Sequence, residues 1–208
     1  MIIFYSLIIT GLITRISCIA LWPLEKNLSC SQYHYQDLIN LFNQCFAKTH
    51  NTYLIKGDDE PIYLPSDERR TYHGIYFAYG YFSSALHECA HWFIAGEQRR
   101  QQIDYGYWYE PDGRTKVQQQ LFEKVEVKPQ AIEWILSVAA GYPFKVSVDN
   151  LNNEDINPQP FKQAIYQQVL VYAQCGLPAR AERFRQAISQ FYNTEKTINL
   201  TLFSTEHC

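Results

Sequence analysis

An H-E-x-x-H motif at residues 87–91 is the feature that most restricts how this chain can fold. It lies inside a segment, residues 80–95, whose apolar residues have helical spacing and which is followed by Gly96, a residue type that commonly ends helices. In a helix, His87 and His91 lie on one face, roughly 6 Å apart along the axis. Because both imidazoles can then bind one cation, the sequence predicts a metal site on this helix.

The motif could also occur by chance, so its surroundings matter. Apolar residues flank it on both sides: Ala85, Leu86, Trp92, Phe93 and Ile94. Two histidines at such a buried surface would be costly without a partner, which favours a metal ion. Glu88 points about 100° away from His87 around the helix and is therefore a poor third ligand. It could still act on a bound water or orient a neighbouring group.

A third ligand has to come from another segment, and Glu126 is the best candidate. It stands between two valines and ahead of Pro129, which predicts a buried carboxylate that needs a cation or a donor. The alternative is a carboxylate that only stabilises the start of a helix beginning at Pro129. Glu123 and Asp104 are rival candidates for the ligand.

Two histidines and a carboxylate are consistent with two chemistries. With zinc and a bound water the site would be a hydrolase, in which Glu88 acts as the general base of a peptidase. With ferrous iron and open coordination positions it would be an oxygenase. A binding module with a structural metal is a third possibility, but such sites usually have four protein ligands, often cysteines. The spacing alone does not choose between the two enzymes.

Composition limits the class of protein and its compartment. The 208 residues are 47% hydrophobic, enough for one folded domain with a full core. The net charge of -3 gives no support for binding nucleic acid. None of the six cysteines forms a Cys-x-x-Cys pair, and we expect mostly reduced thiols and a cytoplasmic protein.

The first 22 residues are almost entirely apolar, which makes them a candidate membrane anchor. A start site assigned too early is the other interpretation, and sequence alone does not separate the two. We therefore divide the chain into an N-terminal extension, residues 1–30, and a catalytic domain, residues 31–208. No contact with a membrane is expected unless the extension is real and acts as an anchor.

The remaining pattern predicts a single α+β domain in which a small sheet packs against helices. We expect helices over residues 31–46, 80–95, 129–140, 160–175 and 178–192, with a further helical stretch before residue 125. We expect strands over residues 52–55, 62–64, 75–78 and 145–148.

Several long strings in the chain resemble the bacterial elongation factor P hydroxylases. Besides residues 87–91 with the following Trp92, they are residues 54–65 (LIKGDDEPIYLP), 94–96 (IAG), 104–109 (DYGYWY), 111–114 (PDGR), 125–131 (VEVKPQA) and 139–144 (AAGYPF). The resemblance extends from about residue 33 to residue 192. It implies an α+β fold, a metal site of the two-histidine, one-carboxylate kind, and a protein-lysine hydroxylase.

The same resemblance implies the reaction and its partners. The substrate would be the β-lysylated lysine side chain of elongation factor P, and the cofactors would be a non-haem metal, Fe(II) or another divalent ion, and dioxygen. Carboxylates and aromatic rings suit such a cationic arm. We therefore expect substrate-binding residues in an acidic turn and in an aromatic loop: Asp58, Asp59, Glu60, Asp104, Tyr107 and Trp108.

Overall fold

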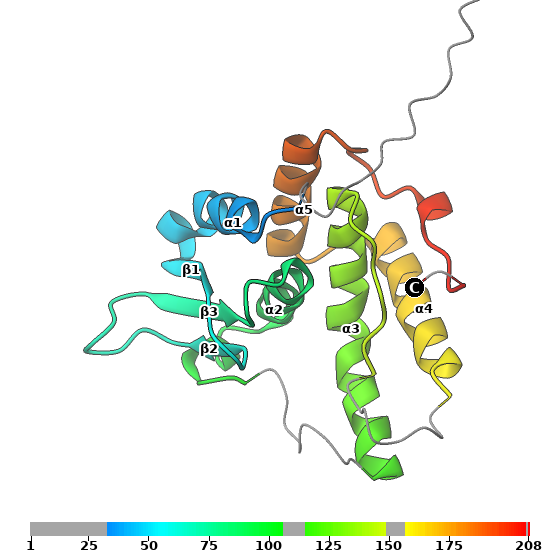
Figure 1. The fold of residues 1–208 in the computed structure, drawn as a ribbon, viewed down its shortest axis with the longest axis horizontal. Helices are drawn as coiled ribbons and strands as arrows, with labels where there is room; N and C mark the ends of the chain where they lie inside the picture. The colour runs from blue at the N-terminus through cyan, green and yellow to red at the C-terminus, as the bar shows by residue number, and fades with distance from the viewer. Residues whose placement is uncertain (1–32, 106–114, 149–156, 207) are drawn as a thin grey trace, which may run out of the picture.

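The computed structural model describes residues 33–105, 115–148, 157–206 and 208 (Figure 1). These residues form a small sheet and a set of packed helices, so the predicted α+β class is confirmed. The elements are α1 (Tyr35–His50), β1 (Thr52–Lys56), β2 (Ile62–Leu64), β3 (His73–Phe77), α2 (Phe82–Ile94), α3 (Lys116–Ala140), α4 (Gln159–Cys175) and α5 (Ala179–Tyr192).

The three strands form one mixed sheet in the order β1-β3-β2. β1 runs parallel to β3, with Leu54 opposite Ile75, and β2 pairs with β3 in the antiparallel direction. The first three predicted strands agree with these elements to within two residues. The parallel pair needs a connection that crosses over, and β2 together with the loops on either side of it provides this connection.

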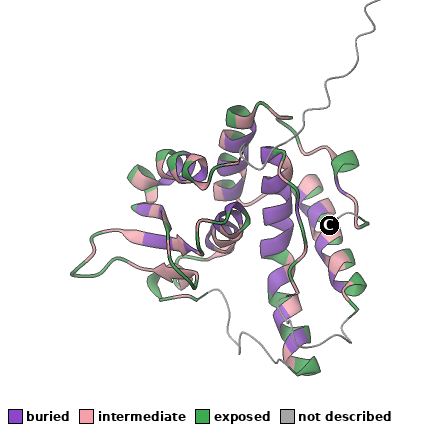
Figure 2. Cartoon of the chain, viewed as in Figure 1, coloured by how far each residue is buried: buried purple, intermediate pink, exposed green. Residues whose placement is uncertain are grey.

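Helix α2 is the centre of the fold, between β3 on one side and α3 on the other (Figure 1). It is drawn mostly in purple and pink in Figure 2, which means that its residues are buried or partly buried. A helix with apolar residues on nearly all sides is typical of such a position. Its polar residues form one stripe: Ser83, Ser84, His87, Glu88 and His91. Polar groups in so buried a helix indicate a function on that face.

A tight connection fixes the point at which α2 begins. Tyr79 and Gly80 both have positive φ, at 51° and 83°. A side chain on Gly80 would also meet the ring of Tyr35, because an added Cβ would lie 3.0 Å from that ring. Glycine is therefore required here both for its φ and for the close approach of α1.

Helix α3 runs without interruption through Pro129, so the prediction of a new helix at that residue is wrong. Proline removes one backbone hydrogen bond in a helix interior, a cost of about 3 kcal/mol. Packing against α2, α4 and α5 offsets this cost along the second half of the helix. The helix begins with a capping box between Thr115 and Gln118 and ends at Gly141, whose φ is 70°.

The predicted strand at residues 145–148 is also wrong, because this segment joins none of the strands. Its backbone is held by a side chain instead. Gln130 donates to the carbonyl of Ser147 at 2.8 Å and accepts from its N–H at 3.1 Å. A buried amide on α3 thus takes the place of a neighbouring strand.

None of the helices among the described residues has both the length and the apolar character that crossing a bilayer requires. Cys45, Cys89, Cys175 and Cys208 are free thiols. The division at residue 30 lies outside the described residues and stays a prediction.

Candidate metal centre

Three predicted ligands come together where α2 packs against α3. The Nε2 atoms of His87 and His91 are 3.0 Å apart. The Glu126 carboxylate lies 3.5 Å from Nε2 of His87 and 3.2 Å from Nε2 of His91. All candidate ligand atoms of this cluster lie within 4.8 Å of one another.

These separations fit a first-row divalent metal ion. Nitrogen and carboxylate ligands at about 2.0–2.2 Å from one cation are roughly 2.8–3.6 Å from each other in tetrahedral or octahedral geometry. The three observed distances, 3.0, 3.2 and 3.5 Å, fall within that interval. The rival candidates do not join the cluster: Glu123 accepts from Gln119, and Asp104 is bound by Arg99.

Glu126 reaches the histidines for a reason that differs from the one predicted. The two valines do not form a buried segment with it, since Val125 is 51% exposed. Glu126 is only 2% exposed because its own position on the helix faces α2. Helical geometry, and not an alternating pattern, therefore directs this carboxylate inward.

A second buried carboxylate, Glu133, was not predicted. It accepts a hydrogen bond from Nδ1 of His87 at 2.8 Å and is 7% exposed. Residues seven apart lie on the same face of a helix, two turns apart, so Glu126 and Glu133 would have been recognised together if α3 had been predicted as one helix. The assumed break at Pro129 hid this relation.

The carboxylates of the cluster favour a positive charge at this position. Burial alone would raise the pKa of Glu126, but the neighbouring His91 and His87 outweigh it and lower this pKa to about 2. Burial alone would lower the pKa of His87, but the hydrogen bond to Glu133 and the charges of Glu133 and Glu126 raise it to about 10. Without a metal ion, the site therefore retains a proton as its positive charge.

Two of the three candidate ligands, His87 and Glu126, line a cleft of about 820 Å³ between the sheet side of the molecule and α3. Glu88 lines this cleft, and it also lines a much smaller pocket beside His91. Burial raises the pKa of Glu88, and the two histidines offset this only in part. The described lining also includes Tyr105, which belongs to the aromatic loop expected to bind substrate. Three further aromatic side chains of the lining were not predicted as site residues: Tyr81, Phe122 and Tyr142.

Comparison with known proteins agrees with this architecture. A family model described as "Elongation factor P hydroxylase" matches residues 41–203, which include all three candidate metal ligands. The chain belongs to this hydroxylase family. It is also 57% identical over 172 residues to the elongation factor P lysine hydroxylase of Haemophilus influenzae, a match that covers 83% of this chain and 97% of that protein. The resemblance seen in the sequence is thus confirmed.

The substrate residues expected for the family lie at different places relative to the cleft. Glu60 lines it, whereas Asp58 and Asp59 are exposed and are not among the lining residues of the cleft. Asp104 lies in the small pocket with Glu88, and its carboxylate accepts from Arg99 at 2.7 Å. Tyr107 and Trp108 lie outside the described residues.

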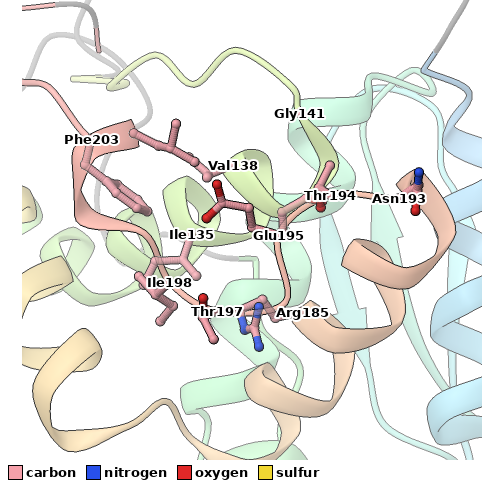
Figure 3. A pocket seen from close by; sticks show the side chains of 12 residues that line it. Ile135, Val138, Gly141, Arg185, Asn193, Thr194, Glu195, Thr197, Ile198 and Phe203 are labelled. Carbon is pink, nitrogen blue, oxygen red and sulfur yellow. The ribbon is translucent and has the colours of Figure 1, made fainter.

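A further cavity, of about 450 Å³, is separate from the cluster of candidate ligands (Figure 3). It lies between the end of α3, Arg185 of α5 and the segment that follows α5. Arg185 is held by both oxygens of Glu182, at 2.7 and 2.8 Å, and by the carbonyl of Lys196. Its charge is therefore already balanced within the fold, which indicates a structural role.

Proposed function

We propose that this chain hydroxylates the β-lysylated lysine side chain of elongation factor P, with Fe(II) and dioxygen as cofactor and cosubstrate. The observation that carries the proposal is the cluster of His87, His91 and Glu126, of which His87 and Glu126 line a large cleft. The relative from Haemophilus influenzae is named for lysine hydroxylation of the same factor. A translation factor as substrate, together with the free thiols, favours the cytoplasm as the location.

The described residues suit a long cationic side chain. A β-lysyl group has two amino groups, and the cleft has four carboxylates in its lining: Glu60, Glu88, Glu126 and Glu133. The two positive charges of the metal ion would neutralise Glu126 and Glu133, which leaves Glu60 and Glu88 to pair with the substrate. The tyrosines of the cleft would contact the aliphatic part of the arm and its ammonium groups.

Three protein ligands would leave positions for dioxygen and substrate around the ion, and bound ferrous iron would supply the ability to activate dioxygen. The protein's own contribution is to hold the ligands and to orient the arm. Gln130 connects these tasks, because it is hydrogen-bonded to Ser147 in the cleft wall and lies 3.5 Å from Glu126. The position of the wall and the position of the carboxylate are therefore linked through one buried side chain.

Glu88→Gln distinguishes this function from that of a zinc peptidase. In a peptidase, Glu88 would take a proton from the metal-bound water that attacks the peptide bond, and its replacement by the amide of glutamine would abolish turnover. In a hydroxylase, Glu88→Gln should keep the metal and reduce the rate by about 10–100-fold, an effect typical of residues that act on a metal site indirectly. The measurement is mass spectrometry of β-lysylated elongation factor P, in which the product is one added oxygen atom.

Ligand variants provide the matched comparison. His87→Ala, His91→Ala and Glu126→Ala should each remove both metal and product, whereas Glu123→Gln, on the same helix as Glu126, should keep both. Product formed with zinc under strict anaerobiosis would refute the proposal. So would peptide cleavage that disappears with Glu88→Gln. Retained metal in Glu126→Ala would refute only the assignment of the third ligand.

A further inference from the structure

We infer that Glu133 is a positioning residue of the metal centre, which holds His87 with Nε2 toward the ion and balances the second positive charge of the metal. The inference rests on the metal-binding part of the proposed function. It concerns a residue that does not itself coordinate the ion.

The geometry of Glu133 fits this role closely. Its Oε2 atom is 2.8 Å from Nδ1 of His87, while Nε2 of the same ring faces His91 and Glu126. The two nitrogens of one imidazole thus have different partners on opposite sides. Among the residues that the structure describes, no lysine or arginine forms an ion pair with Glu133. A histidine is its observed partner, at a site where burial makes a lone carboxylate costly.

The hydrogen bond decides which nitrogen of His87 is free. A neutral imidazole carries its proton on one nitrogen only, and the other nitrogen has the lone pair that binds metal. A carboxylate only accepts, so Glu133 keeps the proton on Nδ1 and leaves the lone pair on Nε2. Without Glu133 the proton could occupy either nitrogen, and the ring could rotate away from the ion.

The charges give a second reason. A divalent ion with neutral histidines and Glu126 alone would leave one positive charge uncompensated in a largely buried site, which is unfavourable. Glu133 does not contact the ion but is hydrogen-bonded to its ligand His87. Its negative charge brings the net charge of the ion, Glu126 and Glu133 to zero. Its position on α3, two turns after Glu126, places both carboxylates toward α2.

A purely structural role, as a brace between α2 and α3, makes a different prediction. A brace would change the stability of the fold and not the affinity of a folded protein for metal. The test therefore measures metal binding in full-length protein without elongation factor P. Fe(II) under anaerobic conditions, and zinc as a diamagnetic substitute, are titrated in competition with a chelator.

Glu133→Gln should remain folded and bind both ions about 10–100-fold more weakly than the wild type, the loss typical of residues that orient a metal ligand. Glu123→Gln is the control on the same helix and should keep wild-type affinity. Glu133→Asp keeps the charge but not the reach and should not restore tight binding. In the zinc-loaded wild type, nitrogen NMR should find the proton of His87 on Nδ1.

Unchanged metal affinity in folded Glu133→Gln would overturn the inference, and so would full affinity in Glu133→Asp or a proton on Nε2 of His87. Loss of affinity only in variants that also lose their near-ultraviolet circular dichroism would show a brace and overturn it as well. None of these measurements needs substrate. If the wild type binds metal as described but adds no oxygen to elongation factor P, the proposed function fails and the role of Glu133 stands.

Discussion

Raising the pH should destabilise the metal-free protein and leave the metal-loaded protein largely unaffected. His87 is the reason, because Glu133 and Glu126 raise its pKa from 6.5 to about 10 against the opposing effect of burial. A group whose pKa is raised on folding makes its full contribution to the free energy of unfolding at pH values below its pKa in the unfolded chain. That contribution is lost as the pH rises toward the folded pKa. The sensitive window therefore extends from about pH 6.5 to about pH 10.

The slope of the unfolding free energy against pH can be calculated from the proton bound at His87. Between these two values the folded chain binds one proton at His87 that the unfolded chain does not bind. Through His87, the free energy of unfolding should therefore fall by about 1.4 kcal/mol for each pH unit. His91 acts in the same direction, because burial alone would lower its pKa but Glu126 outweighs this effect and raises it. From pH 7 to pH 9 the loss through His87 is about 3 kcal/mol, which corresponds to a decrease of roughly 6–12 °C in Tm for a protein of this size. At the acid end Glu126 acts in the opposite direction, because its pKa is lowered from 4.5 to about 2 and its contribution is lost as the pH falls through this interval.

Thermal unfolding between pH 6.5 and 9.5, with chelator or with bound zinc, measures this slope. A metal ion on Nε2 of His87 replaces the proton, so the slope should disappear in the loaded protein. His50→Asn is a suitable control for a histidine outside the cluster. Burial and nearby arginines lower the pKa of His50, so its titration falls below the window and the slope should remain. Equal slopes with and without metal would refute the reasoning.

Two further predictions concern regions outside the cluster. Deletion of residues 1–28 should leave a folded protein with full metal content. The contacts of the described core begin with Tyr33, which donates a hydrogen bond to the carbonyl of Gly141. Metal analysis and circular dichroism measure the outcome, and aggregation of the shortened protein would contradict the prediction. Charge reversal in the acidic turn, residues 58–60, should weaken binding of β-lysylated elongation factor P, since Glu60 alone of the three lines the cleft. Metal content should not change, because Glu60 is not one of the candidate ligands and lies 27 residues before His87. Equal substrate affinity in calorimetry would mean that the turn is only a solvated loop.

The features that depend on local spacing could be predicted from the amino-acid sequence alone. The interval between His87 and His91 places them on one face wherever a helix forms, and the apolar residues around them predict a buried helix. The first three strands were found for a similar reason, since short apolar runs bounded by glycine, aspartate and proline depend little on distant contacts. Fold class and the two histidines could therefore be predicted before any tertiary contact was known.

The positions of Glu126 and Glu133 beside the histidines depend on tertiary packing of α3. Proline is unfavourable in an isolated helix, and only packing against α2, α4 and α5 makes the continuous helix more stable than two shorter ones. That continuity places Glu133 two turns from Glu126 and brings it to Nδ1 of His87, 46 residues away in sequence. The segment at residues 145–148 does not join the sheet, and the side chain of Gln130 binds both backbone groups of Ser147 in place of a neighbouring strand. Such contacts join residues that no periodic pattern relates, and their energies arise only when the helices pack together.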